Sequence, residues 1–246
     1  MHDSEALSQL DILYEDNHLI VVNKLPGEIV QGDKTGDTPL SEKIKAYLKE
    51  KYNKPGNVFV GVVHRLDRPV SGAVIFARTS KALARMNELI KKREVIKRYW
   101  AVVNDMPEPT SGSLVHFLKK NQKKNKSFAV SEQEKGALRA ELDYRFLAAS
   151  KSYSLLEITL HTGRHHQIRV QLSAIKAPIK GDVKYGFKRL NQNGRMIHLH
   201  ARHLEFTHPV KKTPLIIKAD PPEDKLWQVF ADIMRLKENE KQKKDD

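Results

Sequence analysis

A short polar segment at residues 63–72 combines the side chains in this sequence that are best suited to chemistry. It reads Val-His-Arg-Leu-Asp-Arg-Pro-Val-Ser-Gly, so Asp67 follows Arg65 by two residues and directly precedes Arg68. Nearby guanidinium groups stabilise an ionised carboxylate, which suits a nucleophile or a general base and not a general acid. The same spacing also fits a salt-bridged aspartate that only anchors a loop. The residues alone leave both interpretations open.

Two further segments carry groups that could bind a substrate. Residues 160–169 place Arg164 and Arg169 around an expected helix start, where anions such as phosphate or a carboxylate are favoured. Residues 97–103 hold Tyr99 and Trp100 at the start of an expected strand, and aromatic faces stack on extruded bases in RNA recognition. The alternatives are ordinary surface arginines in the first case and two simply packed rings in the second.

The elements that must position these segments are short strands with a few helices between them. Residues 58–63 and 73–76 favour strands on either side of Asp67, which is therefore expected on a loop at a sheet edge. Other strands are expected at 18–22, 99–103, 140–148, 153–160, 199–206 and 215–218, helices at 40–52, from Thr79, after residue 164 and around Leu226, and an exposed loop or hairpin at 119–126. Because strands and helices do not alternate regularly, we expect an α+β fold with a mixed, mostly antiparallel central sheet flanked by helices.

The length and composition of the chain fit one catalytic domain. It has 246 residues, of which 39% are hydrophobic. We expect a lead-in at residues 1–11, a catalytic domain at 12–236 and a solvated charged tail at 237–246. No stretch approaches the roughly 20 apolar residues of a membrane span, and the N-terminus lacks the pattern of a signal peptide. The absence of cysteine excludes disulfides and thiolate catalysis and fits a reducing cytoplasm, where a monomer is the default expectation.

The formal net charge of +14 points to an anionic partner. The last ten residues hold four lysines and four acids, so the excess lies in the folded body. Basic clusters occur at 91–98, at 176–189 and at Lys119, Lys120, Lys123, Lys124 and Lys126. Such surfaces attract phosphate backbones by releasing counterions, so nucleic acid is the expected partner. A lysine-rich soluble protein without nucleic acid is the alternative, and no strongly amphipathic basic helix favours a membrane surface.

The segment His64-Arg65-Leu66-Asp67 with Ser71-Gly72 resembles the active-site motif of the RluA family of RNA pseudouridine synthases. Similar blocks follow the family's order over about residues 12–220, at 21–27, 97–103, 162–169, 178–186 and 199–209. Leu25 and Val70 depart from the usual pattern. Because the chain starts directly at the catalytic region, the resemblance is to the form without an S4-like RNA-binding domain.

This resemblance implies the isomerisation of uridine in structured ribosomal or transfer RNA, without a cofactor or a metal. Asp67 would act at the sugar as nucleophile or base, Arg169 would pair with it, and Tyr99 would stack on the detached uracil and assist proton removal from C5. Arg65 is implied as a wedge, and Ile197 or Leu199 as an apolar pocket wall. Further RNA contacts are expected from His64, Arg164, Lys119, Lys120, Lys123 and Lys124.

Two other functions remain as alternatives. His198, His200 and His203 have a spacing that could hold zinc in a metal-dependent hydrolase, although the neighbouring Arg202 opposes cation binding. A non-catalytic RNA-binding or ribosome-assembly protein could share the fold. A kinase-like interpretation of His-Arg-x-Asp fails because the sequence lacks both the glycine-rich loop and the Asp-Phe-Gly motif.

Overall fold

The computed structural model describes residues 10–33, 35–191 and 194–245, with side chains described up to residue 240 of the last helix. The chain divides into two compact units. The first runs up to Lys97 and takes in Ala201–Asp220, and the second comprises Arg98–His200 and Pro221–Asp246. Both units combine antiparallel strands with helices, so the α+β fold class predicted from the sequence is confirmed.

The first unit is built around strands β2 and β4. It contains β1 (Ile12–Glu15), β2 (Leu19–Lys24), α2 (Leu40–Lys51), β3 (Gly61–Val62), β4 (Ser71–Ala77), α3 (Ser80–Lys91), most of β10 (Leu199–Thr207) and β11 (Pro214–Lys218). The strand order is β1-β2-β4-β10, with β3 also on β4 and β11 on β10. The antiparallel register pairs Lys24 at the end of β2 with Gly72 at the start of β4. The loop that carries Asp67 therefore enters β4 beside the end of β2.

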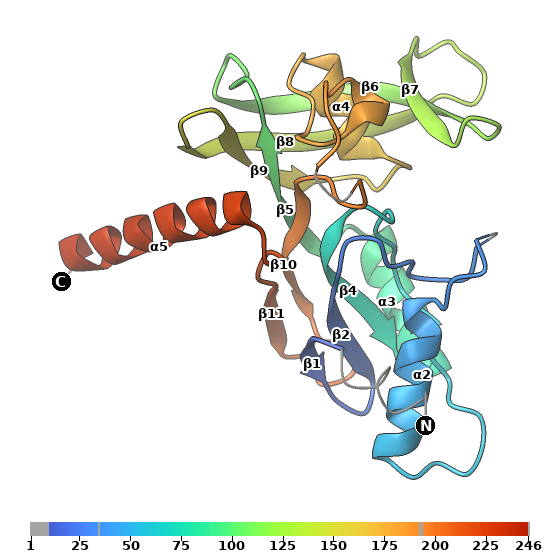
Figure 1. Ribbon diagram of the computed structural model, residues 1–246. Helices are drawn as coiled ribbons and strands as arrows, with labels where there is room; N and C mark the ends of the chain where they lie inside the picture. The colour runs from blue at the N-terminus through green and yellow to red at the C-terminus, as the bar shows by residue number, and fades with distance from the viewer. Residues whose placement is uncertain (1–9, 34, 192–193, 246) are drawn as a thin grey trace. The chain divides into compact units, whose positions relative to one another are not determined.

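Strand β4 lies inside the sheet, between β2 and β10, and all seven of its residues are buried. Helix α3 packs against β3 and β4 (Figure 1). It begins after Thr79, whose side chain accepts the N–H of Ala82 at 3.1 Å, so the helix start predicted from the sequence is confirmed. Ala82 and Met86 turn inward from this helix onto the core. The result is a rigid base for the loop that precedes β4.

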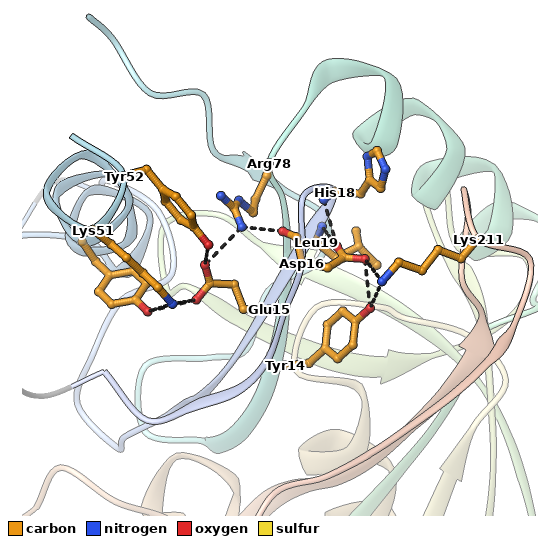
Figure 2. A network of polar contacts seen from close by, with 10 residues as sticks. Tyr14, Glu15, Asp16, His18, Leu19, Lys51, Tyr52, Arg78 and Lys211 are labelled. Atoms are coloured by element: carbon orange, nitrogen blue, oxygen red, sulfur yellow. Dashed lines mark hydrogen bonds and ion pairs between the residues drawn. The ribbon is translucent and has the colours of Figure 1, made fainter. Parts of the chain in front are cut away.

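Two carboxylates, one at the end of β1 and one in the turn after it, tie parts of the first unit together (Figure 2). Glu15 accepts hydrogen bonds from Tyr52 and Lys51 at 2.6 and 2.8 Å, which joins β1 to the end of α2. Asp16 accepts the backbone N–H of Leu19 at 2.8 Å and forms a 2.9 Å ion pair with Lys211. Burial opposes ionisation of Asp16, yet these contacts hold its pKa well below the usual value. The network stabilises the unit and lies apart from the Asp67 loop in sequence.

The second unit is built on a sheet of antiparallel strands. It contains most of β5 (Ile96–Val103), β6 (Ser111–Asn121), β7 (Lys126–Val130), β8 (Leu138–Ala149), β9 (Ser154–Leu160), α4 (Gln167–Ala174), the short 3-10 helix η1 (Val183–Tyr185) and α5 (Lys225–Asp245). Its strand order is β5-β9-β8-β6-β7. Strands β6 and β7 form a hairpin whose tip carries the expected lysine cluster, and α4 packs against both (Figure 1).

Helix α5 begins in the core of the second unit and continues into solvent. Trp227 and Phe230 pack in a core cluster with Trp100. Beyond them Ile233 and Met234 still pack against this cluster, and Lys237 donates to the carbonyl oxygen of Leu147 in β8 at 2.6 Å before the helix continues through Asp245 (Figure 1). Residues 237–245, expected as a charged tail, thus belong to this helix, and those with described side chains are exposed. Among the described residues, no helix combines the length and apolar character that crossing a lipid bilayer requires.

Three elements differ from the sequence-based expectation. Strand β1 was not expected, and it forms by pairing with β2. Strand β3 covers only Gly61–Val62 of the expected residues 58–63, where Phe59 is largely exposed instead of packing as a strand residue. Strand β6 starts at Ser111, well before the expected hairpin. Its alternating exposed and half-buried residues give a weaker apolar signal than a core strand does.

Candidate active site

Asp67 lies in the loop between β3 and β4 of the first unit. The residue is half-buried, whereas Arg65 and Arg68 are exposed. Leu66 turns inward and is only 9% exposed. Val70 donates its backbone N–H to the carbonyl oxygen of Asp67 at 3.0 Å, which closes a turn directly after the aspartate. A buried side chain before Asp67 and a turn after it therefore fix the main chain that carries the carboxylate.

A fully buried lysine, at the end of β2, anchors this loop. Lys24 has 0% exposure, and its Nζ donates to the carbonyl oxygens of Leu25 at 2.9 Å and Arg68 at 3.1 Å. Burial lowers the pKa of Lys24 to about 7, although the negative charges of Glu28 and Asp67 act in the opposite direction. The loop is thus held through its main chain, and the amino group is near enough to the Asp67 carboxylate to interact with its charge.

His64, a predicted RNA contact, has a partner inside the fold. Its Nε2 accepts the backbone N–H of Ile75 at 3.2 Å. Burial, together with the positive charge of Lys97, lowers the pKa of His64 to about 3. The ring is therefore neutral near pH 7, which is the form that can accept this bond. His64 ties the loop to β4, and its contact with RNA stays a prediction.

Gly72 explains why a glycine ends this motif. Its φ is +116°, and a Cβ at this position would lie 2.4 Å from the carbonyl oxygen of Ala201. Both the backbone conformation and the close approach of β10 therefore require glycine. Gly27 adds another main-chain contact by donating its N–H to the carbonyl oxygen of Arg68 at 2.8 Å.

Arg169 lies in the first turn of α4, in the second unit, and is held by a buried ion pair. Its Nε and Nη2 donate to the two carboxylate oxygens of Asp182 at 2.7 and 2.9 Å. The two side chains are 6% and 1% exposed. The guanidinium carbon also lies 5.0 Å from the centre of the Tyr185 ring. A bidentate carboxylate and an aromatic face together fix the plane of the guanidinium.

Tyr99 and the two predicted pocket residues are buried parts of the second unit. Tyr99 and Trp100 are each 6% exposed, and as neighbours in β5 their side chains point to opposite faces of the strand. Trp100 packs in the core cluster with α5. Ile197 and Leu199 are 4% and 3% exposed, so both are apolar side chains enclosed by protein.

The basic residues expected to bind RNA gather on the hairpin of the second unit. Lys120, Lys123 and Lys124 are exposed at and near its tip. Lys119 forms a 2.9 Å ion pair with Glu134. Arg164, just before α4, is exposed, and its Nε donates to the carbonyl oxygen of Arg139 at 2.9 Å. Because these cations lie at the surface, they can contact phosphates without breaking buried interactions.

The histidines that suggested zinc have other partners. His198 Nε2 lies 2.9 Å from an oxygen of Asp224, and burial lowers the pKa of His198. His203 Nε2 lies 3.3 Å from a carboxylate oxygen of Glu205. Across residues 10–33, 35–191 and 194–245, no group of three or more histidine, cysteine, aspartate or glutamate side chains is arranged to hold a metal ion. The described residues therefore contain no set of metal ligands of the kind that a metal-dependent hydrolase requires.

The sequence-predicted trio is divided between the two units. Asp67 belongs to the first unit, whereas Tyr99 and Arg169 belong to the second. Sequence reasoning assigned no role to Lys24, Asp182 or Tyr185, although all three lie in the blocks that carry the resemblance. A lysine that ends a buried strand is a detectable signal, whereas the Arg169–Asp182 pair spans 13 residues and a helix end, which spacing alone does not reveal.

Comparison with known proteins gives consistent matches. A family model described as RNA pseudouridylate synthase matches residues 18–174. Ribosomal large subunit pseudouridine synthase D of Xylella fastidiosa is 35% identical over 235 residues, which cover 90% of this chain and 69% of that protein. tRNA pseudouridine synthase C of Vibrio cholerae is 30% identical over 236 residues, covering 89% of this chain and 93% of that protein. The solved structure of Human RNA Pseudouridylate Synthase Domain Containing 4 has a TM-score of 0.73 and 26% identity, covering 89% of this chain and 91% of that one.

Proposed function

Because this chain belongs to the RNA pseudouridylate synthase family, we propose that it uses the carboxylate of Asp67 to isomerise uridines of ribosomal or transfer RNA. The chain is an RNA pseudouridine synthase, an isomerase that converts uridine in RNA to pseudouridine. One observation carries the role of Asp67: its loop is anchored by a fully buried lysine while the flanking arginines face solvent. A loop fixed in this way presents a carboxylate to a large anionic substrate.

The reaction sets clear demands on the protein. The bond from sugar C1′ to uracil N1 breaks, a bond from C1′ to C5 forms, a proton leaves C5 and N1 gains one. The product has the atoms of the substrate, so no external oxidant or reductant is consumed. The base must leave the stack, water must be kept from the detached uracil, and an ionised carboxylate must lie near C1′. Asp67 supplies that carboxylate, as nucleophile or as base.

Arg169 keeps the carboxylate ionised and correctly aimed. A guanidinium has five N–H groups, of which the Asp182 carboxylate takes one on Nε and one on Nη2. The remaining edge of the group serves Asp67 in the proposed site. The support is the orientation that Asp182 and Tyr185 impose on Arg169 within its own unit.

Tyr99 and the apolar residues act on the uracil. The ring of Tyr99 stacks on the detached base, and its hydroxyl assists removal of the C5 proton. Ile197 or Leu199 closes the apolar side of the pocket and helps to exclude water. Their nearly complete burial supports this assignment.

RNA docks on exposed cations of both units. Arg65 fills the space that the extruded base leaves, with His64 beside it, and Arg164 binds a phosphate near α4. Lys119, Lys120, Lys123 and Lys124 of the hairpin bind the RNA backbone, which makes affinity dependent on salt. The net charge of +14 and the exposure of the hairpin lysines support this docking surface.

The substrate class follows from the relatives. One is named for ribosomal RNA of the large subunit and another for transfer RNA, so a stem-loop of either kind is the proposed substrate. We propose that the protein works as a monomer in the cytoplasm, where these RNAs are processed. The absence of cysteine in the sequence fits that reducing compartment.

Replacement of Asp67 tests the proposal directly. We expect Asp67→Asn and Asp67→Ala to lower the rate of pseudouridine formation by more than about 10³-fold, because no other group supplies the carboxylate. Affinity for RNA should stay within about 3-fold, since phosphate contacts dominate binding. The assay is pseudouridine mapping on ribosomal and transfer RNA from cells that lack the gene, incubated with each purified variant.

Asp105→Asn is the matched control, because Asp105 is an exposed aspartate whose side chain accepts from neighbouring Asn104. It should match the wild type in rate and affinity. A near wild-type rate for Asp67→Asn would refute the role of Asp67. RNA binding by the wild type without any new pseudouridine would favour the non-catalytic RNA-binding alternative.

A further inference from the structure

Tyr185 is buried between the RNA-binding hairpin and Arg169 within the second unit. It is 5% exposed and ends the short helix η1. Its hydroxyl accepts the backbone N–H of Ser127 at 2.9 Å and donates to the carbonyl oxygen of the same residue at 3.2 Å. His166 Nδ1 lies 2.8 Å from the same hydroxyl. All three bonds form together when Nδ1 of His166 carries its proton.

The partner residue Ser127 belongs to the lysine-bearing hairpin. It is the second residue of β7 and pairs in register with Lys120. Its own hydroxyl lies 2.8 Å from His165 Nδ1, and Lys184 next to Tyr185 donates to the carbonyl oxygen of Asn125 at 3.2 Å. The tip end of the hairpin is therefore bonded to the segment just before α4 and to η1.

The other side of Tyr185 faces cations. The Arg169 guanidinium carbon lies 5.0 Å from the ring centre, and Lys126 Nζ lies 4.9 Å from it. His166 precedes α4 with φ 56°, and burial lowers its pKa to about 2, so the ring stays neutral beside Arg169. One aromatic side chain thus contacts the arginine through its face and the hairpin through its hydroxyl.

We propose that Tyr185 is a positioning residue that couples the seating of the hairpin on RNA to the orientation of the Arg169 guanidinium. The inference rests on the proposed function, because Arg169 must act on Asp67 for its orientation to affect the reaction. When phosphates bind the hairpin lysines, β7 and Ser127 become more rigid, and the tyrosine hydroxyl transmits this to the ring under Arg169. Docking of RNA then raises the rate of the chemical step in addition to raising affinity.

Tyr185→Phe separates the two contacts, because it keeps the ring and removes the hydroxyl. We expect the single-turnover rate at saturating RNA to fall about 10-fold, since small displacements of a catalytic group have large effects on rate. KM should change by less than about 3-fold. The matched control is Tyr144→Phe, which removes another buried tyrosine hydroxyl of the same unit, bonded to the carbonyl oxygen of Pro109 at 2.9 Å. The control should keep the wild-type rate.

A double-mutant cycle distinguishes coupling from a merely structural role. Replacing Lys120, Lys123 and Lys124 by alanine should raise KM and lower the single-turnover rate of the wild type. In the Tyr185→Phe background the same replacement should still raise KM but leave the rate unchanged, because the connection is already cut. Rate effects that multiply independently, or a Tyr185→Phe rate equal to that of the Tyr144→Phe control, would overturn the inference.

Amide hydrogen exchange distinguishes failure of the inference from failure of the proposed function. Total transfer RNA at low salt should slow exchange in residues 167–174 of the wild type, and this protection should disappear in Tyr185→Phe. If no RNA gains pseudouridine with the wild type, the proposed function fails, and the exchange measurement alone decides the coupling. Equal protection in wild type and Tyr185→Phe overturns the coupling whatever the activity.

Discussion

The Asp67 loop and the Arg169 side chain are held in opposite ways. The buried anchor of the loop binds main-chain atoms, since Lys24 donates to the carbonyl oxygen of Arg68, and Arg68 adds an exposed ion pair with Asp37. Arg169 is held through its own guanidinium, by the Asp182 carboxylate and the Tyr185 ring. The printed contacts of the Asp67 loop fix the chain that carries the carboxylate, whereas those of Arg169 clamp the functional group itself. Loss of a main-chain anchor should therefore shift a loop, whereas loss of the clamp removes the buried carboxylate that pairs with the guanidinium.

The largest effect expected from this comparison comes from Asp182→Ala. It leaves the nearly buried Arg169 guanidinium without its carboxylate, which should lower the free energy of unfolding by about 3–5 kcal/mol. Urea unfolding followed by circular dichroism measures it. The control is Asp143→Ala in the same unit, whose side chain is 46% exposed beside His161 and which should cost no more than about 1 kcal/mol. Equal effects of the two substitutions would show that Arg169 is not clamped by its ion pair.

A main-chain constraint is tested by Gly72→Ala. The added Cβ would meet the backbone of Ala201 at 2.4–2.5 Å, and φ is +116°, so strain and overpacking should together cost about 2–4 kcal/mol. Gly112→Ala is the matched control, because the atoms nearest to its added Cβ are Tyr144 side-chain atoms at 3.5 Å and its φ is not in the left-handed region. That control should lie within about 1 kcal/mol of the wild type. A harmless Gly72→Ala would mean that the entry into β4 can move, contrary to the comparison.

Sequence reasoning performed well wherever local pattern decides the structure. The start of α3 follows from Thr79 and an apolar spacing, and the exposed loop or hairpin at 119–126 follows from a lysine-rich stretch that is too polar for the core. It performed poorly where the pairing of strands decides the structure. Residues of β1 are only half-buried and form a strand because β2 lies beside them, whereas Phe59, in an apolar run, is left outside the sheet.

The same division applies to the candidate site. Asp67, Arg65 and Arg68 could be selected from one segment, because their types and spacing are visible in the sequence. The anchors could not, because they come from distant positions: Lys24 reaches a carbonyl 44 residues away, and Tyr185 reaches one 58 residues away. Contacts to main-chain atoms are also independent of the partner's residue type, so they leave no signal at the partner position.

The smallest effect at neutral pH is expected for Lys24→Met, and its pH dependence is the informative part. Loss of two donated hydrogen bonds is offset by removal of a buried ammonium group, so the net change at pH 7 should be about 1 kcal/mol or less. Burial lowers the pKa of Lys24 to about 7 in the folded state, below the unfolded value of 10.5. Between these values the unfolded chain binds more protons than the folded one, so this lysine makes stability rise with pH. Below pH 7 both states are protonated and the contribution is flat.

The difference in unfolding free energy between wild type and Lys24→Met should therefore grow from pH 7 towards 10, by up to about 1.4 kcal/mol per pH unit. Measuring the difference cancels other groups that titrate in this range. Lys49→Met, which removes an exposed lysine of α2, accounts for the loss of one surface charge. A neutral amine retains two N–H groups for the carbonyls of Leu25 and Arg68, so the anchor persists as the charge is lost. A difference that stays constant up to pH 9.5 would mean that Lys24 is solvated in solution, and the Asp67 loop would then lack the buried main-chain anchor that sets it apart from Arg169.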